Sequence, residues 1–186
     1  MYSTQDFRKG LKIEVDGEPF IIVDFQHVNP GKGGAFVRTK IKSLLTGRQM
    51  DPTFKAGDKV GTPDVSEDDM QFLYGDADSF NFMDVKTFDQ HQIPKENLGD
   101  AVDYLKPEMK VTIQFYKGKA IGITMPNFVE LKVVKCDPGV RGDTVGGAQK
   151  PATLETGATF NVPLFINEGD NIRVDTRSHE YVSRVE

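Results

Sequence analysis

The sequence is poor in the residues that build crosslinks, metal sites and membrane spans: it has one cysteine, no tryptophan and three histidines in 186 residues. The single cysteine, Cys136, excludes an intramolecular disulfide framework and fits a reducing compartment. No apolar run approaches the ~20 residues that a membrane-spanning helix requires. Residues 1–6 lack the basic and apolar regions of a secretion signal. We therefore expect a cytoplasmic protein without a membrane partner.

Signals for catalysis, metal binding and cofactor binding are also missing. The histidines lie far apart, and none stands at ligand spacing to another histidine or to the cysteine. Asp76 and Asp78 suggest a calcium loop, but Phe80 occupies the place of a third oxygen ligand. The carboxylates are scattered, so no acid–base pair can be named. The sequence predicts no catalytic residue, no metal and no cofactor, which is typical of a protein that is not an enzyme.

The acidic charge is unevenly distributed. The net charge of −5 argues against a protein that wraps nucleic acid with a uniformly basic surface. Residues 1–64 carry ten Lys and Arg against eight Asp and Glu, a balance of +2. The balance is −5 for residues 65–127 (six against eleven) and −2 for residues 128–186 (seven against nine). The first third is therefore the favoured place for contact with an anionic partner.

Short strand-like runs separated by turn signals fill most of the chain. Asp16-Gly17 is a strong hairpin signal, and similar turns recur about every ten residues. This spacing predicts small β-barrels. Changes of composition at residues 61–64 and 124–127 predict three domains, 1–64, 65–127 and 128–186. One short helix is expected between Pro94 and Pro107, where apolar residues follow helical spacing.

A glycine-rich loop at residues 29–36 joins two strand-like runs in the first predicted domain. Its central lysine has glycines on both sides, and such residues permit a tight, open backbone with a long cationic side chain at its tip. A phosphate-binding loop would need Ser or Thr directly after the lysine and then a helix. Here Gly33 and a strand follow. The tip-loop residues are Pro30, Gly31, Lys32, Gly33 and Gly34.

Two groups of basic residues are candidates for RNA contact. Strand alternation places Arg38, Lys40 and Lys42 on one face, which is either a solvated strand face or a stripe that follows phosphates. The second group lies in the last third of the chain, where a five-stranded barrel commonly engages oligonucleotides. The alternative there is that the tyrosine packs in the core and the arginines are merely solvated. The members of the second group are Lys150, Arg173, Arg177, Tyr181 and Arg184.

Three segments together resemble bacterial translation elongation factor P over essentially the whole chain. They are residues 6–13, residues 30–36, and a C-terminal set at 150–157, 162–166, 169–170, 175–177 and 180–181. The C-terminal set is the most specific, since a glycine loop alone is common. Two residues depart from the family pattern: Phe160 stands where an aliphatic residue is usual, and His179 where a glycine is usual.

The resemblance implies an all-β fold of three small barrels, an SH3-like (KOW-like) barrel followed by two OB-fold barrels, in an L-shaped arrangement that resembles a tRNA. It implies a monomeric elongation factor that binds the 70S ribosome between the peptidyl-tRNA and exit sites. The factor promotes peptide-bond formation at consecutive prolines. By the same resemblance, Lys32 is modified by a synthetase-like ligase, in many members by β-lysylation, and its extended side chain approaches the 3′ end of a prolyl-type peptidyl-tRNA.

Two other functions remain open at this stage. A generic single-stranded RNA-binding OB protein without ribosome specificity would bind free oligonucleotides whether or not Lys32 is present. An enzyme that uses Lys32 as a nucleophile or phosphate anchor has the weakest support, because no base or metal partner is near in sequence.

Overall fold

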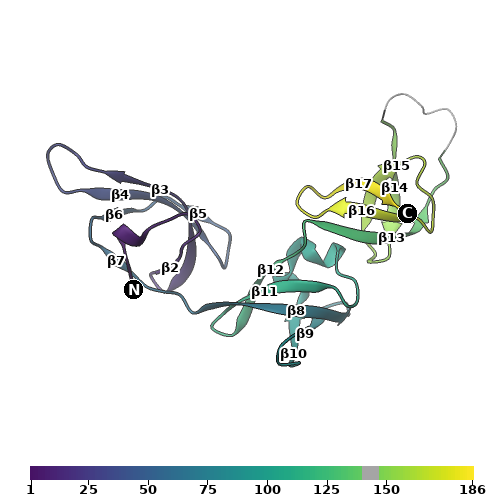
Figure 1. Ribbon diagram of the computed structural model, residues 1–186, viewed down its shortest axis with the longest axis horizontal. Coiled ribbons are helices and arrows are strands. Elements are labelled where there is room, and N and C mark those ends of the chain that lie inside the picture. Colours follow the sequence, from purple (N-terminus) through teal and green to yellow (C-terminus); the bar gives the residue numbers. More distant parts are fainter. Residues whose placement is uncertain (140–146) are drawn as a thin grey trace. The chain divides into compact units, whose positions relative to one another are not determined.

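The computed structural model describes residues 1–139 and 147–186, and its regular structure in these ranges is almost entirely β (Figure 1). Two compact units can be distinguished. The first contains Met1–Glu67 and Gln114–Gly122, and the second contains Asp68–Ile113 and Ile123–Glu186. No helix in the described ranges is long and apolar enough to cross a membrane. The all-β prediction is confirmed.

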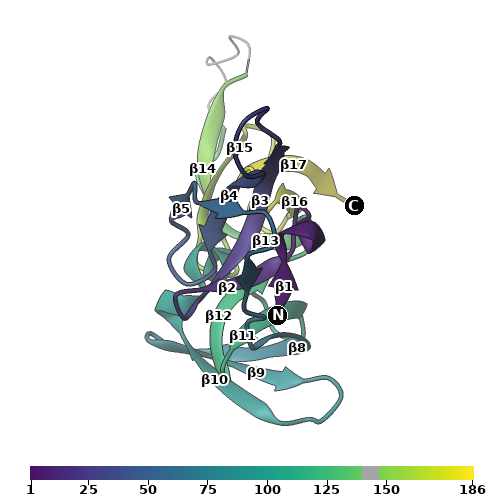
Figure 2. The ribbon, with the colours of Figure 1, turned by 90° about the vertical axis from the view of Figure 1, so that its left-hand side faces the viewer.

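The first unit is built on a curved antiparallel sheet in the order β2-β3-β4-β5, and β6 also pairs with β4. Figure 2 shows β3 and β4 as its long central pair. Asp16 and Gly17 have φ values of 51° and 79°, the conformation that a two-residue hairpin turn requires. A 3₁₀ turn, η1, spans Thr4–Asp6. The strands are β1 (Tyr2–Ser3), β2 (Lys12–Val15), β3 (Glu18–Val28), β4 (Phe36–Ser43), β5 (Gln49–Met50), β6 (Thr53–Lys55) and β7 (Lys59–Val60).

Strand alternation determines the core of this unit. Val37, Thr39 and Ile41 of β4 point inward and are buried, as their spacing predicts. The Thr39 hydroxyl donates to the Pro52 carbonyl at 2.8 Å, so its burial leaves no unpaired polar group. The other buried apolar residues are Phe7, Leu11, Ile13, Phe20, Ile22 and Val60.

Two further five-stranded antiparallel sheets follow in the chain. One has the order β10-β9-β8-β11-β12 and the other β15-β14-β13-β16-β17. The first set comprises β8 (Val65–Gly75), β9 (Ser79–Asp84), β10 (Gln90–Pro94), β11 (Lys110–Tyr116) and β12 (Lys119–Thr124). The second comprises β13 (Phe128–Cys136), β14 (Gln149–Leu154), β15 (Thr159–Pro163), β16 (Asn171–Asp175) and β17 (Glu180–Val185).

The helix expected between Pro94 and Pro107 is two 3₁₀ segments, η2 (Lys95–Asn97) and η3 (Gly99–Asp103). Gly99 at the start of η3 has a φ of 55°, which is incompatible with a continuous α-helix. With prolines at both ends, the remaining stretch is too short for a stable α-helix. The prediction was right about a helical segment and wrong about its type.

Tyr104, which follows η3, belongs to the hydrophobic core of the sheet formed by β13–β17. It is 2% exposed and clusters with the buried residues of those strands. The ring centroids of Tyr104 and Phe160 are 5.8 Å apart, and the Tyr104 hydroxyl is hydrogen-bonded to Nδ1 of His179. Beside it, the Thr156 hydroxyl donates to the Asp103 carbonyl at 2.7 Å. The C-terminal core is therefore completed by a side chain from the preceding segment.

Replacing Tyr104 with Ala should lower the free energy of unfolding by about 3–5 kcal/mol, because it opens a cavity in this core. Tyr104→Phe keeps the ring and loses only the hydroxyl, so it should cost about 1 kcal/mol. Urea denaturation of the full chain measures both. Tyr74→Ala is the matched control, since Tyr74 is 59% exposed and should change the value by less than about 0.5 kcal/mol. A Tyr104→Ala variant as stable as this control would contradict the assignment.

Candidate functional site

The tip loop lies beyond the last pair of the β3–β4 ladder. Val28 of β3 and Phe36 of β4 form that last pair, and residues 29–35 connect them. Figure 1 shows this connection extending away from the rest of the first unit. Lys32 lies in it and is exposed. The ladder thus carries a primary amine outward on a paired, and hence stiff, stem.

The glycines of the loop leave its backbone open. A Cβ added at Gly31 or Gly34 would meet no atom within 4 Å. Gly33 has a φ of 111°, a conformation that side-chain-bearing residues rarely adopt. Another molecule could therefore approach the main chain on either side of Lys32. The loop shape itself depends on Gly33 alone among these three glycines.

The predicted basic stripe lies at the base of this hairpin. Arg38, Lys40 and Lys42 are all exposed on the outer face of β4, as alternation predicts. The Arg38 guanidinium lies 5.6 Å from the ring centroid of Phe36. Residues on this face also line a cavity of about 370 Å³ that includes Asp24 and Asp51. The cations are therefore accessible but interspersed with carboxylates.

Asp24 is already engaged at this face. Its carboxylate lies 3.1 Å from the Lys9 ammonium, and the hydrogen bond from Lys9 lowers the pKa of Asp24 below its usual range. Because Lys9 neutralises Asp24, that carboxylate opposes an approaching phosphate less than an unpaired one would.

The residues of the predicted C-terminal patch make contacts within their own barrel, and their role in RNA binding stays a prediction. Lys150 is 6% exposed, and its ammonium donates to the Asp137 carbonyl at 2.6 Å. Arg173 is paired with Glu130 at 2.8 Å. Tyr181 is half-buried against the core of its barrel, the alternative that the sequence left open. Arg184 lies 5.9 Å from the centroid of the Phe165 ring. Lys150 shares the inward face of β14 with Ala152 and Leu154, and that alternation was the available signal of its burial.

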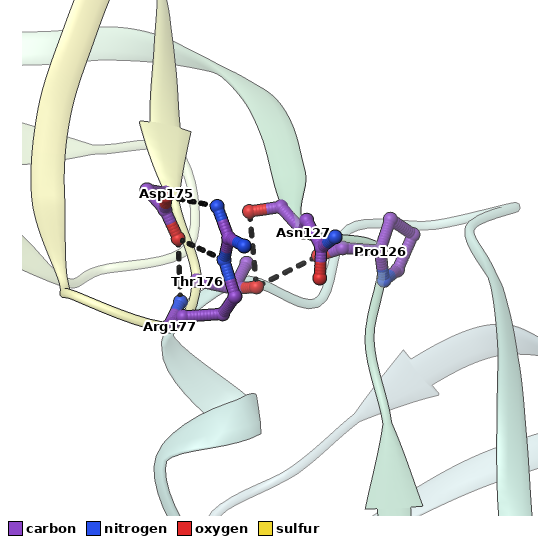
Figure 3. A network of polar contacts seen from close by, with 5 residues as sticks. All are labelled: Pro126, Asn127, Asp175, Thr176 and Arg177. Atoms are coloured by element: carbon purple, nitrogen blue, oxygen red, sulfur yellow. Dashed lines mark hydrogen bonds and ion pairs between the residues drawn. The ribbon is translucent and has the colours of Figure 1, made fainter.

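Arg177 is held by a local network that the sequence reasoning missed (Figure 3). Its backbone N–H, Nε and Nη2 donate to the Asp175 carboxylate at 2.8, 3.1 and 2.8 Å. These contacts lower the pKa of Asp175 to about 2, and the hydrogen bond from the Arg177 side chain has the largest effect. Thr176 lies between Asp175 and Arg177 in the sequence. Its hydroxyl donates to the Pro126 carbonyl at 2.7 Å, and its backbone N–H donates to the Asn127 carbonyl at 2.9 Å. Thr176 therefore holds the chain segment at 126–127, and the Asp175–Arg177 contacts fix the turn on either side of it. The close Asp-x-Arg spacing was the available signal for the Asp175–Arg177 pair.

Family models match nearly the whole chain. Residues 3–60 match the elongation factor P (EF-P) KOW-like domain, residues 65–123 its OB domain and residues 129–184 its C-terminal domain. The predicted KOW-like and OB folds are thereby confirmed. The exact boundaries proposed from composition stay a prediction.

Relatives named elongation factor P match over their full length. The chain is 53% identical to that of Bdellovibrio bacteriovorus over 185 residues, covering 100% of this chain and 98% of the relative. It is 53% identical to that of Moorella thermoacetica over 184 residues, covering 99% and 100%. It is 52% identical to that of Natranaerobius thermophilus over 185 residues, covering 100% and 98%.

Two solved structures share the fold. One is the eukaryotic translation initiation factor 5A from Methanococcus jannaschii, with a TM-score of 0.56 and 23% identity over 67% of this chain and 93% of that chain. The other is a translation initiation factor eIF-5A family protein from Naegleria fowleri, with a TM-score of 0.53 and 16% identity over 66% and 94%. At these identities the likeness concerns the fold alone.

The three loop glycines should respond differently to alanine. Gly33→Ala should destabilise the loop conformation by about 1 kcal/mol, because alanine is strained at a φ of 111°. Gly31→Ala and Gly34→Ala are the matched controls, because a Cβ at either position meets open space. Each should change the stability of the loop conformation by less than about 0.5 kcal/mol. Amide chemical shifts and hydrogen exchange of residues 28–36 report the change. Equal perturbation by all three would contradict the assigned geometry.

The Asp175–Arg177 contact should make stability depend on acid pH. The pKa of Asp175 is depressed in the folded state from 3.8 to about 2, so its stabilising effect is complete above its ordinary pKa and is lost as pH falls toward its folded value. The destabilisation caused by Asp175→Asn, measured by urea midpoints, should therefore shrink from about pH 4 to about pH 2. Arg177→Gln should move the NMR-detected carboxyl titration of Asp175 upward. A titration unchanged by Arg177→Gln would show that another group lowers the pKa.

Proposed function

The chain belongs to the elongation factor P family of translation factors, and from this premise we propose that Lys32 is the residue through which it acts on the ribosome. In this proposal the protein binds the 70S ribosome between the peptidyl-tRNA and exit sites. It promotes peptide-bond formation at consecutive prolines by positioning the 3′ end of the peptidyl-tRNA. The observation that carries the proposal is the exposed amine of Lys32 on a loop that extends from a paired hairpin.

Positioning is a sufficient physical basis for such an effect. Proline reacts slowly because its ring restricts the geometry of attack, and holding reactants in an attack-ready pose contributes up to ~7–11 kcal/mol in favourable cases. A long cation can bridge phosphate and ribose oxygens. The open backbone at Gly31 and Gly34 permits close approach to RNA. The factor would thus act without donating or accepting protons itself.

We propose further that Lys32 is extended after translation by a synthetase-like ligase. An exposed amine with open glycines on both sides is accessible to the active site of a second enzyme. Extension would lengthen the reach of the side chain while the hairpin stem keeps its base in place. The modified group would then be the part of the molecule that contacts the peptidyl-tRNA end.

The proposed RNA-facing surface of the first unit consists of Arg38, Lys40 and Lys42. Their exposure on one strand face supports contact with a sugar–phosphate backbone. Support for Lys150, Arg173, Arg177 and Tyr181 as further contacts with the RNA backbone is weaker, because the lysine is buried, the arginines are paired with carboxylates and the tyrosine is half-buried.

Reconstituted translation tests the role of Lys32. Protein purified from its native source should relieve stalling on a polyproline reporter, whereas Lys32→Ala and Lys32→Arg should each lose most of that effect, on the order of tenfold or more in rate. Lys32→Arg keeps the positive charge and removes the acylatable amine, so it separates charge from modification. A reporter without consecutive prolines should respond to none of the proteins.

Mass spectrometry with fragmentation across residues 20–45 identifies the state of Lys32 in the same samples. Unmodified Lys32 in a fully active protein would overturn the modification, and a fully active Lys32→Ala variant would overturn the whole proposal.

A further inference from the structure

His179 adopts a backbone conformation that is unusual for a residue with a side chain. It lies in the turn between β16 and β17 and has a φ of 60°. Its N–H donates to the Asp175 carbonyl at 2.9 Å, which fixes the turn. Non-glycine residues in this left-handed region carry strain that the surrounding structure must offset, and such strain concentrates at functional sites.

The imidazole ring of His179 is held in place by two aromatic side chains. It stacks on Phe160, with ring centroids 4.3 Å apart and planes 23° from parallel, and Phe160 is 3% exposed. The ring of Tyr104 meets it edge-on at 5.5 Å, and the Tyr104 hydroxyl is hydrogen-bonded to its Nδ1. His179 is nevertheless exposed. The result is a flat aromatic surface with a buried backing and a free side.

The Tyr104 hydroxyl engages one of the two ring nitrogens of His179. Burial, with smaller effects of Asp103, Asp100 and Asp175, raises the pKa of Tyr104 to about 12, so the hydroxyl remains protonated and can either donate to Nδ1 or accept from it. The bond engages Nδ1, so Nε2 is the second hydrogen-bonding atom of the ring. The ring therefore offers a polar nitrogen in addition to its exposed face.

A cavity of about 570 Å³ borders this ring. Most of the lining residues come from β15, from β17 and from the turn before β17, and these two strands are the outer strands of the C-terminal sheet. The volume lies within the range of roughly 300–1,000 Å³ that is usual for small-ligand sites. Besides Phe160 and His179, it is lined by Gln149, Thr159, Asn161, Ser178, Glu180 and Tyr181.

The lining fits a neutral heteroaromatic ligand better than a phosphate. Amides and hydroxyls can donate and accept hydrogen bonds, and Glu180 supplies a carboxylate acceptor. Among the described residues that line the cavity there is no lysine or arginine to bind an anion. Nucleobases have the matching chemistry, a π-face for stacking and polar edges, and aromatic side chains including histidine stack on unpaired bases.

We propose that the cavity beside His179 binds an unpaired RNA base, stacked on the exposed face of the imidazole. Glu180 accepts a hydrogen bond from the exocyclic amino group of the base, so adenine and cytosine are preferred over uracil. The base enters the cavity while its phosphates stay outside, away from the carboxylate of Glu180. This site does not involve Lys32, so its existence does not depend on the role proposed for that residue.

Fluorescence anisotropy with labelled short oligo(A), oligo(C) and oligo(U) tests the site in the full chain. His179→Asn is the central variant, because asparagine tolerates the left-handed backbone and can still accept from Tyr104, but it lacks an aromatic face. It should weaken binding of oligo(A) by about 5- to 100-fold. Glu180→Gln should reduce the preference for oligo(A) over oligo(U) by about fivefold or more.

Phe88→Asn is the matched control. Phe88 is also an aromatic residue at positive φ, 63°, and is 68% exposed, but it does not line the cavity. This variant, like Lys32→Ala, should bind oligo(A) as the unsubstituted chain does. Should His179→Asn prove unfolded by thermal denaturation, the NMR signals of the His179 ring in the unsubstituted chain provide the second measurement, and they should shift on titration with oligo(A).

Three results would overturn the proposal: equal affinity of the His179→Asn variant, equal binding of oligo(A) and oligo(U), or His179 ring signals that do not respond to oligo(A). Free AMP is added as a competitor of labelled oligo(A). If it competes as effectively as unlabelled oligo(A), recognition of the base is supported, and the ligand is a free nucleotide instead of an RNA strand. Loss of translation activity in Lys32 variants has no bearing on any of these outcomes, so the two proposals can fail separately.

Discussion

The antiparallel ladder between β3 and β4 is the interaction on which the candidate site depends. It pairs Phe20 with Ser43 at one end and Val28 with Phe36 at the other, and a register shift between Ile22 and Asp24 interrupts it. Because side chains alternate along β4, the same strand anchors itself in the core through Val37 and Ile41 and exposes cations on its other face. One strand therefore supplies the support of the tip loop and the charge beside it. Loss of pairing would remove both.

Pairing of charges distinguishes the two basic groups more than their number does. In the C-terminal barrel, Arg173 and Arg177 are bound to Glu130 and Asp175, and Lys150 is buried. The first pair joins β13 to β16, the second lies in the turn after β16, and each carboxylate reduces the positive potential of its arginine. Arg173 and Arg177 are as exposed as the cations of β4, so what sets them apart is that each has a carboxylate partner. A chain with a net charge of −5 can thus present a local cationic surface at one end of its sequence without being basic as a whole.

Tyr104, Phe160 and His179 show how distant residues form one structural group. Phe160 and His179 are the two residues at which the sequence departs from the pattern it otherwise resembles, and their rings are stacked. The larger ring of Phe160 supports an imidazole where a glycine would leave space, and Tyr104 fixes the orientation of that imidazole through its Nδ1. The strained backbone of His179 is offset by these contacts. The group closes the core on one side and borders a polar cavity on the other.

Features that depend on local order can be predicted from the sequence: the β-hairpins, the inward and outward faces of β4, the turn at Asp16-Gly17 and the exposed glycine loop around Lys32. Alternation and turn preference act between neighbours, so neighbouring residues suffice to read them. Four features became evident from the folded chain: Lys150 is buried, Arg177 folds back on Asp175, the helical segment consists of 3₁₀ turns, and Tyr104 completes a distant core. These outcomes depend on which partner lies within a few ångströms after folding, and contacts between residues far apart in the chain leave no periodic trace in the sequence.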